Sequence, residues 1–425
     1  MCFSYRTGPV WRVELDMMES ASASLDVADF PRFLVIQNGA RHNYAIPAAF
    51  QRAGALSALY TDFVATQGLG SVLSRMAPAN GRLAEVLERR TPPAEIAGKV
   101  FCDSPSFLAG RAVSAPFGIR AGFFCQMLLS QQRMAFRGAQ NATHLYTMFG
   151  EGGSFIAKAK DKGLQVVGDV FIPLSADQIV SDEEAHNPDW ADKEPKQTTL
   201  AQTIQANQNL LNLSDFLICP SEFVRDDLLK YGVDLRRTLV VPYAVGAKWL
   251  DLEVEPQPGR VLFAGTASLR KGIHHLAAAA TLLKGQCKIR VAGAVSERVR
   301  NHPEARDLAF LGHLGPFRMA EEFARADVFA FPSLVEGSAG VTGEALGAGL
   351  PVVATRAAGS IVRDGVDGLI IPERHPEALA QAIMSIVLDR DRREAMSQAA
   401  RQRAQVFTWD GFVHRVIQAT IKITK

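Results

Sequence analysis

The feature that most constrains the fold of this sequence is a repeated order of apolar run, glycine-containing loop and helical segment. Residues 33–36 are an apolar run, a turn follows at Asn38-Gly39, and apolar residues then recur at helical spacing until Gly54. The same order recurs at 152–173 and at 215–233. Alternating strands and helices of this size are typical of a parallel sheet with helices on both faces.

An acidic, proline-bearing stretch at 251–259 interrupts the alternation, which then restarts. A chain of 425 residues is also long for one core, so we predict two doubly wound, Rossmann-like α/β domains facing a cleft. The predicted divisions are an N-terminal extension (1–30), an N-terminal domain (31–250), the linker (251–259), a C-terminal domain (260–407) and a C-terminal helix (408–425) that Thr408 caps.

Composition excludes several classes of function. The formal charge of +2, from 46 basic and 44 acidic side chains, gives no global field that favours nucleic acid. Five scattered cysteines form no CxxC pair, so neither a metal cage nor a disulfide framework is indicated. No uninterrupted apolar stretch reaches the roughly 20 residues that span a bilayer, and the N-terminus lacks the pattern of a secretory signal. We expect a cytoplasmic protein.

Two carboxylates eight residues apart mark the first candidate site. Glu336 and Glu344 flank a glycine-rich and hydroxyl-rich segment that leaves a predicted strand and enters a helix predicted at 343–349. Gly337 and Gly340 leave backbone N–H groups open to a phosphate or sugar oxygen near the start of that helix. Ionised carboxylates only accept hydrogen bonds, which suits the neighbouring hydroxyls of a sugar or ribose ring.

A second candidate element is the loop 263–272. It follows a predicted strand, contains Arg270-Lys271 and ends at a predicted helix start near Gly272. Two cations there suit a diphosphate, since arginine binds oxygens bidentately and lysine acts as a point charge. The alternative is a pair of solvated surface residues. The loop falls at the same edge of the same predicted sheet as the two glutamates, which favours the ligand interpretation.

The C-terminal half resembles the family-4 glycosyltransferases of the GT-B architecture. The matching segments are FAGTASLRKG, LGHL, ADVFAFPS, the E-x7-E pair formed by Glu336 and Glu344, EALGAGLPVVAT and DGVDGLIIP. ICPSEFVRDDLLKYGVDLRRTLVVPYAV is similar to the end of that family's N-terminal domain, and residues 30–170 match by pattern only. The resemblance implies a GT-B fold in which the last helix crosses back to the N-terminal domain.

The resemblance also implies roles for individual residues. Arg270 and Lys271 hold the diphosphate and steady it as a leaving group, Glu336 meets the sugar hydroxyls near the reacting carbon, and Glu344 meets the ribose hydroxyls. His144 is the nearest candidate for the histidine that the N-terminal domain of this family offers near the reacting carbon. The remaining residues expected to contact the donor are Gly39, Gly265, His313, Leu314, Ser338, Ala339, Gly340, Val341 and Thr342.

The implied activity is retaining transfer of a sugar from a nucleotide-sugar donor to a polysaccharide, lipid-linked or other acceptor. No cofactor and no metal are expected, because no DxD-like pair lies near these loops. The preferred mechanism has departure and attack on the same face, and a covalent intermediate on Glu336 stays open. The alternative function is a catalytically weak nucleotide-sugar-binding partner of another enzyme. An epimerase or a phosphorylase is disfavoured, since no lysine for a pyridoxal cofactor is evident.

Two positions depart from the family pattern. Thr266 stands where many members carry an arginine, so Arg270 and Lys271 must supply the positive charge. The segment GSAG replaces the usual GFG after Glu336, which reshapes the sugar pocket and leaves the donor sugar, the base, the acceptor, the linkage and the oligomeric state unassigned.

Several N-terminal features have two interpretations. His144 is a catalytic or a structural histidine, Gly39 a donor contact or a plain turn, and Arg41-His42 an acceptor-side pair or a solvated loop. The helix predicted at 118–138, with its apolar stripe Ile119, Phe123, Phe124, Met127 and Leu128 and with Arg120, Arg133 and Arg137 nearby, packs into the core or lies on the inner face of an anionic membrane. The acidic loop predicted at 175–199, with Asp182, Glu183, Glu184 and His186, is interpreted as solvated rather than as a metal site.

Overall fold

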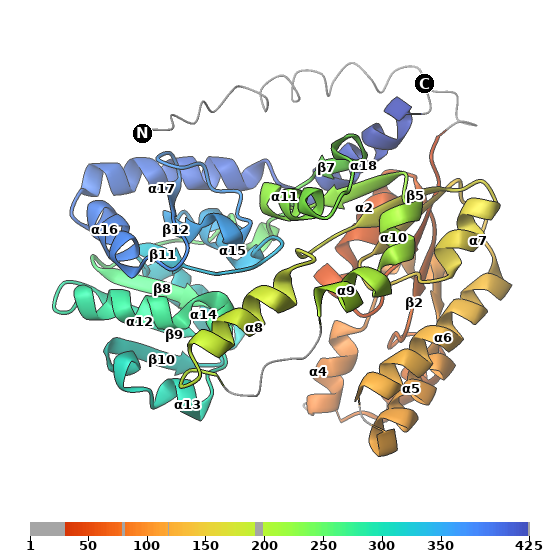
Figure 1. Cartoon of the computed structure of the whole chain (residues 1–425), viewed down its shortest axis with the longest axis horizontal. Helices are drawn as coiled ribbons and strands as arrows, with labels where there is room; N and C mark the ends of the chain where they lie inside the picture. The colour runs from red at the N-terminus through yellow and green to blue at the C-terminus, as the bar shows by residue number, and fades with distance from the viewer. Residues whose placement is uncertain (1–29, 79–80, 118, 192–198, 424–425) are drawn as a thin grey trace.

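The computed structural model of the chain describes residues 30–78, 81–117, 119–191 and 199–423 (Figure 1). The predicted extension therefore lies outside the described residues, except for residue 30. Two all-parallel sheets form the frame, as predicted, one of seven strands in the order β3-β2-β1-β4-β5-β6-β7 and one of six in the order β10-β9-β8-β11-β12-β13.

The strands of the first sheet are β1 (Phe33–Ile36), β2 (Leu56–Thr61), β3 (Val100–Cys102), β4 (His144–Met148), β5 (Gln165–Asp169), β6 (Phe216–Cys219) and β7 (Thr238–Val240). Those of the second sheet are β8 (Arg260–Ala264), β9 (Lys288–Ala292), β10 (Leu308–Gly312), β11 (Val328–Phe331), β12 (Val352–Thr355) and β13 (Gly368–Ile371).

Helices cover the first sheet on both faces. Because side chains alternate along a strand, Phe33 and Val35 of β1 enter one core while Leu34 and Ile36 enter another. All four are fully buried, which is the pattern of a parallel strand between two helical layers.

The helices before the second sheet are α2 (Ala45–Arg52), α3 (Gly68–Met76), α4 (Arg82–Arg89), α5 (Ser104–Phe117), α6 (Ile119–Arg137), α7 (Phe155–Asp161), α8 (Ala176–His186), α9 (Leu200–Ala206), α10 (Gln208–Leu213) and α11 (Glu222–Lys230).

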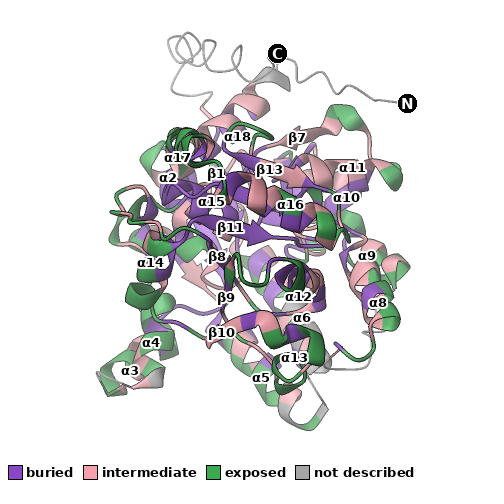
Figure 2. Ribbon diagram, turned by 90° about the vertical axis from the view of Figure 1, so that its left-hand side faces the viewer, coloured by how far each residue is buried: buried purple, intermediate pink, exposed green. Residues whose placement is uncertain are grey.

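The second sheet is built around one continuous core. Figure 2 shows the strands β8, β9 and β11 largely in purple, inside helices whose outer faces are green. Its helices are α12 (Ile273–Leu282), α13 (Glu297–Arg300), α14 (Pro316–Arg325), α15 (Gly340–Gly347), α16 (Pro376–Val387) and α17 (Arg390–Gln405).

The last helix, α18 (Trp409–Ile423), crosses back and packs on the N-terminal domain, as predicted. Its start is capped by Thr408, whose Oγ1 accepts the N–H of Gly411 at 3.0 Å. Its apolar face lies against α2, and Phe412 is fully buried in the core that contains β1. The linker and this helix are therefore two of the connections between the domains.

The interpretation of 175–199 as a solvated loop was wrong for its first half. Residues Ala176–His186 form α8, and Glu183 on this helix is buried. Four residues after the end of α8, Trp190 is buried in the core of the C-terminal domain. Most residues of this segment are polar, but Glu183 and Trp190 lie against the C-terminal domain, and their contacts there bury them. Residues 192–198 lie outside the described part.

The helix predicted at 118–138 is present as α6. Arg133 pairs with Asp103 at 2.6 Å, and Arg137 donates to the carbonyl of Cys102 at 3.0 Å, so both arginines serve the N-terminal domain. Leu128 is exposed, whereas the side chains of Ile119, Arg120, Phe123, Phe124 and Met127 lie outside the described residues. Within the described part of the chain, no helix combines the length and the apolarity that a membrane crossing needs.

We predict that Phe412→Ala lowers the free energy of unfolding by about 3 kcal/mol, because it leaves a cavity in a packed core. Asp410→Asn on the same helix removes only an exposed ion pair with Arg52 and should change it by less than about 1 kcal/mol. Urea unfolding followed by circular dichroism measures both. Equal effects of the two substitutions would show that α18 is not part of the N-terminal core.

Candidate functional site

Arg270, Lys271 and Glu336 form one ion cluster at the carboxyl edge of the second sheet. The two cations lie on the short helix η6 (Leu269–Lys271), after β8, and Glu336 lies on the loop after β11, the neighbouring strand. Lys271 Nζ is 2.9 Å from Glu336 Oε1, and Arg270 Nη1 is 3.1 Å from Glu336 Oε2. The sequence prediction that these loops face each other is confirmed, with the addition that the cations hold the glutamate directly.

Lys271 is the more buried of the two cations. Its ammonium group lies 4.8 Å from the centre of the Phe331 ring. Burial lowers the pKa of Lys271, and the carboxylate of Glu336 opposes that effect. Gly265 makes room for this side chain: a Cβ at that position would lie 3.2 Å from Cδ of Lys271, and its φ of 137° favours glycine. Gly265 therefore leaves room for the lysine side chain, and its contact with a donor stays a prediction.

Backbone hydrogen bonds fix the two loops to each other. The carbonyl of Arg270 accepts the N–H of Leu334 at 2.9 Å and the hydroxyl of Ser333 at 3.1 Å. The N–H of Glu336 donates to the carbonyl of Ala357 at 2.8 Å. These hydrogen bonds within the protein therefore position the two loops that carry the charged side chains.

A pocket lies beside this cluster, at the start of α15. It is lined by Ser338–Gly340 and Thr342-Gly343 from one domain, by Tyr243–Val245 from the segment between the domains, and by Ile361. The helix begins at Gly340, three residues earlier than predicted, and its N-cap Ala339 makes no side-chain hydrogen bond. The N–H groups of Ala339 and Thr342 donate to the carbonyls of Ala358 and Ala339, so these two are already engaged.

Glu344 lies about one turn into α15 and is partly buried. Burial raises the pKa of its carboxyl group, and the nearby Lys248 opposes the shift. His313 and Leu314 follow β10, two strands away from β8, which corresponds to about 10 Å across a sheet. His313 is exposed and Leu314 is buried, so the segment borders the same carboxyl edge without contacting the ion cluster.

The position of His144 contradicts its predicted place near the reacting carbon. His144 is the first residue of β4 and pairs with Phe33, the first residue of β1, so it lies at the amino edge of the sheet. Its ring nitrogens contact Thr143 at 2.8 Å and Gln165 at 3.1 Å. Four residues of extended strand, about 13 Å, separate it from the carboxyl edge. His144 is a structural histidine.

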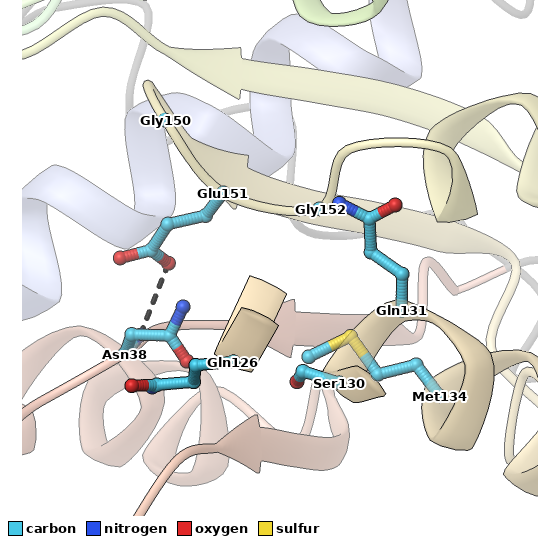
Figure 3. Close-up of a pocket in the computed structure, with 8 residues that line it drawn as sticks. All are labelled: Asn38, Gln126, Ser130, Gln131, Met134, Gly150, Glu151 and Gly152. Atoms are coloured by element: carbon cyan, nitrogen blue, oxygen red, sulfur yellow. Dashed lines mark hydrogen bonds between the residues drawn. The ribbon is translucent and has the colours of Figure 1, made fainter. Parts of the chain in front are cut away.

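The carboxyl edge of β4 instead presents Glu151, which the sequence prediction missed. The side chain lies in a pocket lined by residues of the β1 and β4 loops and of α6 (Figure 3). The eight lining residues are Asn38, Gln126, Ser130, Gln131, Met134, Gly150, Glu151 and Gly152. The N–H of Asn38 donates to Glu151 Oε2 at 3.0 Å, while Oε1 is buried without a hydrogen bond. A glutamate between glycines directly after a buried strand was the available signal.

Arg41 connects this pocket with the other domain. Its Nε lies 3.5 Å from Glu151 Oε1, and its guanidinium lies 4.3 Å from the centre of the Phe171 ring. The carbonyl of Phe171 in turn abuts Gly337, where a Cβ would overlap that oxygen. Ser221 also donates to the carbonyl of Gly337 at 2.6 Å. The two domains therefore touch directly next to Glu336.

Two other residues of the first loop have contacts within the protein. His42 packs between Tyr243 and Trp409, with ring centres 4.7 Å from each. Desolvation between these rings, helped by the charge of Arg41, lowers the pKa of His42 to about 4. Its acceptor-side interpretation stays a prediction. The N–H of Gly39 donates to Asp62 at 2.9 Å, which supports the plain-turn interpretation of that glycine.

Known protein sequences resemble part of this chain. Residues 258–389 match the family model described as glycosyl transferases group 1. The D-inositol 3-phosphate glycosyltransferase of Xylanimonas cellulosilytica is 29% identical over 254 residues, which cover 51% of this chain and 59% of the relative. The enzyme of that name from Geodermatophilus obscurus is 32% identical over 219 residues, covering 44% and 48%. The chain thus spans about half the length of the curated relatives it matches.

Solved structures resemble the whole fold. Anabaena HepE in complex with UDP and glucose covers 92% of this chain and all of its own, with a TM-score of 0.59 and 14% identity. Sucrose-phosphate synthase of Thermosynechococcus elongatus covers 93% and 99%, with a TM-score of 0.61 and 16% identity. At such identities the likeness concerns the fold alone, which is the GT-B arrangement of two parallel-sheet domains.

Glu151 makes stability depend on pH. Burial raises its pKa from 4.5 to about 8, although Arg41 and the N–H of Asn38 oppose the shift. Between these two pH values the native state holds a proton that the unfolded chain has released, so stability falls as pH rises, by at most about 1.4 kcal/mol per pH unit. We predict that Glu151→Gln removes this part of the slope. The difference in Tm between variant and wild type should grow from pH 5 to pH 8, and a constant difference would contradict the prediction.

Proposed function

We propose that this chain, in which residues 258–389 form a group 1 glycosyltransferase domain within a GT-B fold, transfers a sugar from a nucleotide-sugar donor to a hydroxylated acceptor. The observation that carries the proposal is the cluster of Arg270, Lys271 and Glu336 beside the start of α15. A departing diphosphate gains negative charge while the sugar becomes oxocarbenium-like. Fixed cations stabilise the diphosphate and a carboxylate stabilises the positive charge on the sugar, so both lower the barrier.

In the proposed donor complex, Arg270 and Lys271 contact the diphosphate and Glu336 accepts hydrogen bonds from the sugar. Glu344 takes the ribose, Ser338, Gly340 and Val341 offer backbone N–H groups, and the segment His313-Leu314 borders the base. We favour departure of the diphosphate and attack of the acceptor on the same face, with retention of configuration and without a metal ion.

The pocket around Glu151 is the proposed acceptor site. It lies in the other domain and is joined to Glu336 through Arg41, Phe171 and Gly337. Its lining offers three amides, one hydroxyl and one carboxyl group, and none of the eight residues is a cation. Such a lining recognises hydroxyl groups and suits an uncharged sugar or polyol better than a phosphorylated one.

A catalytically weak nucleotide-sugar-binding protein is the second candidate. The observation in its favour is Thr266, which leaves Arg270 and Lys271 alone to neutralise the diphosphate while both are also engaged with Glu336. Binding without turnover across a broad panel of donors and acceptors would favour this second function over the first.

A thermal-shift screen with UDP-, GDP-, ADP- and dTDP-sugars tests the donor site first, because a ligand that binds the native state raises Tm. With the donor so identified, Lys271→Ala should lower kcat/KM about a hundredfold, as the loss of a transition-state charge contact does. Lys284→Ala, an exposed lysine paired with Asp307 in the same domain, is the matched control and should retain activity. Equal activities of the two variants would refute the role of Lys271.

Glu336→Gln separates sugar recognition from diphosphate binding. Removal of the carboxylate frees two cations, so the variant should bind the nucleoside diphosphate at least as tightly as wild type while donor turnover falls by about a hundredfold. Isothermal titration calorimetry and a product assay measure the two quantities. Full turnover in Glu336→Gln would place the sugar elsewhere.

The acceptor site is tested by Gln131→Ala, which removes one amide from the pocket without removing a charge. The expected result is a rise of about tenfold in KM for the acceptor with little change in KM for the donor, since one hydrogen bond contributes about 1.4 kcal/mol or less. A change in donor KM alone would assign this pocket to the donor.

A further inference from the structure

A segment of the N-terminal half reaches the C-terminal domain behind the cation loop. Helix α8 follows the loop after β5 and packs against η6, which carries Arg270 and Lys271. Figure 1 shows α8 beside α12, away from the strands that precede it in the sequence. The end of the segment is anchored by Trp190, which stacks on His302 with ring centres 3.9 Å apart. We call residues 176–191 the arm.

Glu183 is the buried ionic contact of the arm. Its Oε1 accepts from His274 Nε2 at 2.8 Å and from Asn187 at 3.1 Å, and its Oε2 accepts from Arg374 at 2.7 Å. The side chain is only 5% exposed. Burial alone would raise the pKa of Glu183, but the hydrogen bonds from His274 and Arg374, with His275 nearby, outweigh it and hold that pKa well below its ordinary value. The carboxylate is charged when it holds these donors.

The carboxylate and the two histidines are close enough together to hold a metal ion. However, both oxygens of Glu183 already accept from protein donors, and one of those donors is the cationic Arg374. Hydrogen bonds and an ion pair therefore account for this burial without another ligand.

His274 is close in sequence to the proposed diphosphate cations. It follows Lys271 by three residues and is the second residue of α12. Gly272 lies between them and is the N-cap of that helix, and its carbonyl accepts the N–H of Leu276 at 2.9 Å. A bond that fixes His274 thus fixes the first turn of α12 and, through a short rigid turn, the loop in front of it.

We propose that Glu183 is a positioning residue for diphosphate binding: from the arm it holds His274 and Arg374, and thereby sets Arg270 and Lys271 in the geometry that receives the diphosphate. The residue touches no substrate and acts through η6. This inference rests on the proposed function for its biological meaning, but it concerns the binding of a diphosphate group by whatever compound carries it.

The test is a double-mutant cycle on diphosphate binding. Glu183→Gln keeps an acceptor for His274 but removes the charge that pairs with Arg374, and Lys271→Ala removes a binding cation. Affinity for inorganic pyrophosphate and for UDP, GDP, ADP and dTDP is measured by calorimetry on the folded full-length chain. We expect Glu183→Gln to bind about fivefold to twentyfold more weakly than wild type. In the Lys271→Ala background the same substitution should cost less than threefold, because both changes act on one loop.

Asp182→Asn is the matched control, since Asp182 is the exposed neighbour on the same helix and its substitution changes the charge equally. It should leave affinity within twofold of wild type. A purely structural Glu183 would lower Tm yet leave the affinity of the folded protein unchanged, or reduce affinity equally in both backgrounds, and either result overturns the proposal. If Glu183→Gln does not fold, His274→Leu, which keeps the Glu183–Arg374 pair, takes its place in the cycle with the same expectations.

The outcomes separate this inference from the proposed function. Wild type that binds pyrophosphate or a nucleoside diphosphate but no nucleotide sugar contradicts the proposed function, while the cycle still decides the role of Glu183. Wild type that binds a nucleotide sugar, with an unchanged affinity in Glu183→Gln, refutes only the positioning role. No binding of any of these probes by wild type refutes both.

Discussion

Two like charges on adjacent residues repel each other, and the candidate site depends on how this chain holds them together. Glu336 forms ion pairs with both Arg270 and Lys271, so the cations converge although one of them is largely buried. Leaving such charges without a partner in a low dielectric would cost several kcal/mol. The space beside Gly265 and the bonds between the two loops follow from this requirement, because each keeps the cations within reach of one carboxylate.

The contact between the domains gives the site its second half. The backbone of one domain at Gly337 meets the carbonyl of Phe171 from the other domain. A side chain at position 337, next to Glu336, would not fit there. Arg41 continues this contact to Glu151. The proposed donor site at the cations and the proposed acceptor site near Glu151 are therefore linked by this chain of contacts.

Local pattern predicted the frame of the molecule well. The strands β1, β6, β8 and β11 and the cap of α18 follow from apolar runs, glycine stops and a threonine, all of which act over a few residues. It also placed Arg270, Lys271 and Glu336 at one edge, because parallel strands bring their carboxyl ends together. The same logic failed for His144, because this residue begins β4 instead of following it and therefore lies at the amino edge of the sheet. Glu151 was missed, and Glu183 was wrongly interpreted as solvated, for a different reason. Their partners lie more than 90 residues away in sequence, as Arg41 does for Glu151 and His274 for Glu183, and no local pattern reports such a contact.

The polypeptide passes between the two sheets more often than a pair of linked domains requires. The arm enters the C-terminal domain and the chain returns to α9, the linker crosses again, and α18 crosses back. For protein engineering this means that the C-terminal domain is not an interchangeable cassette bounded by 260 and 407. A chimera that exchanges this half with a relative would also have to exchange residues 176–191 and 409–423, or rebuild their complementary surfaces, before any altered donor preference could be attributed to the pocket itself.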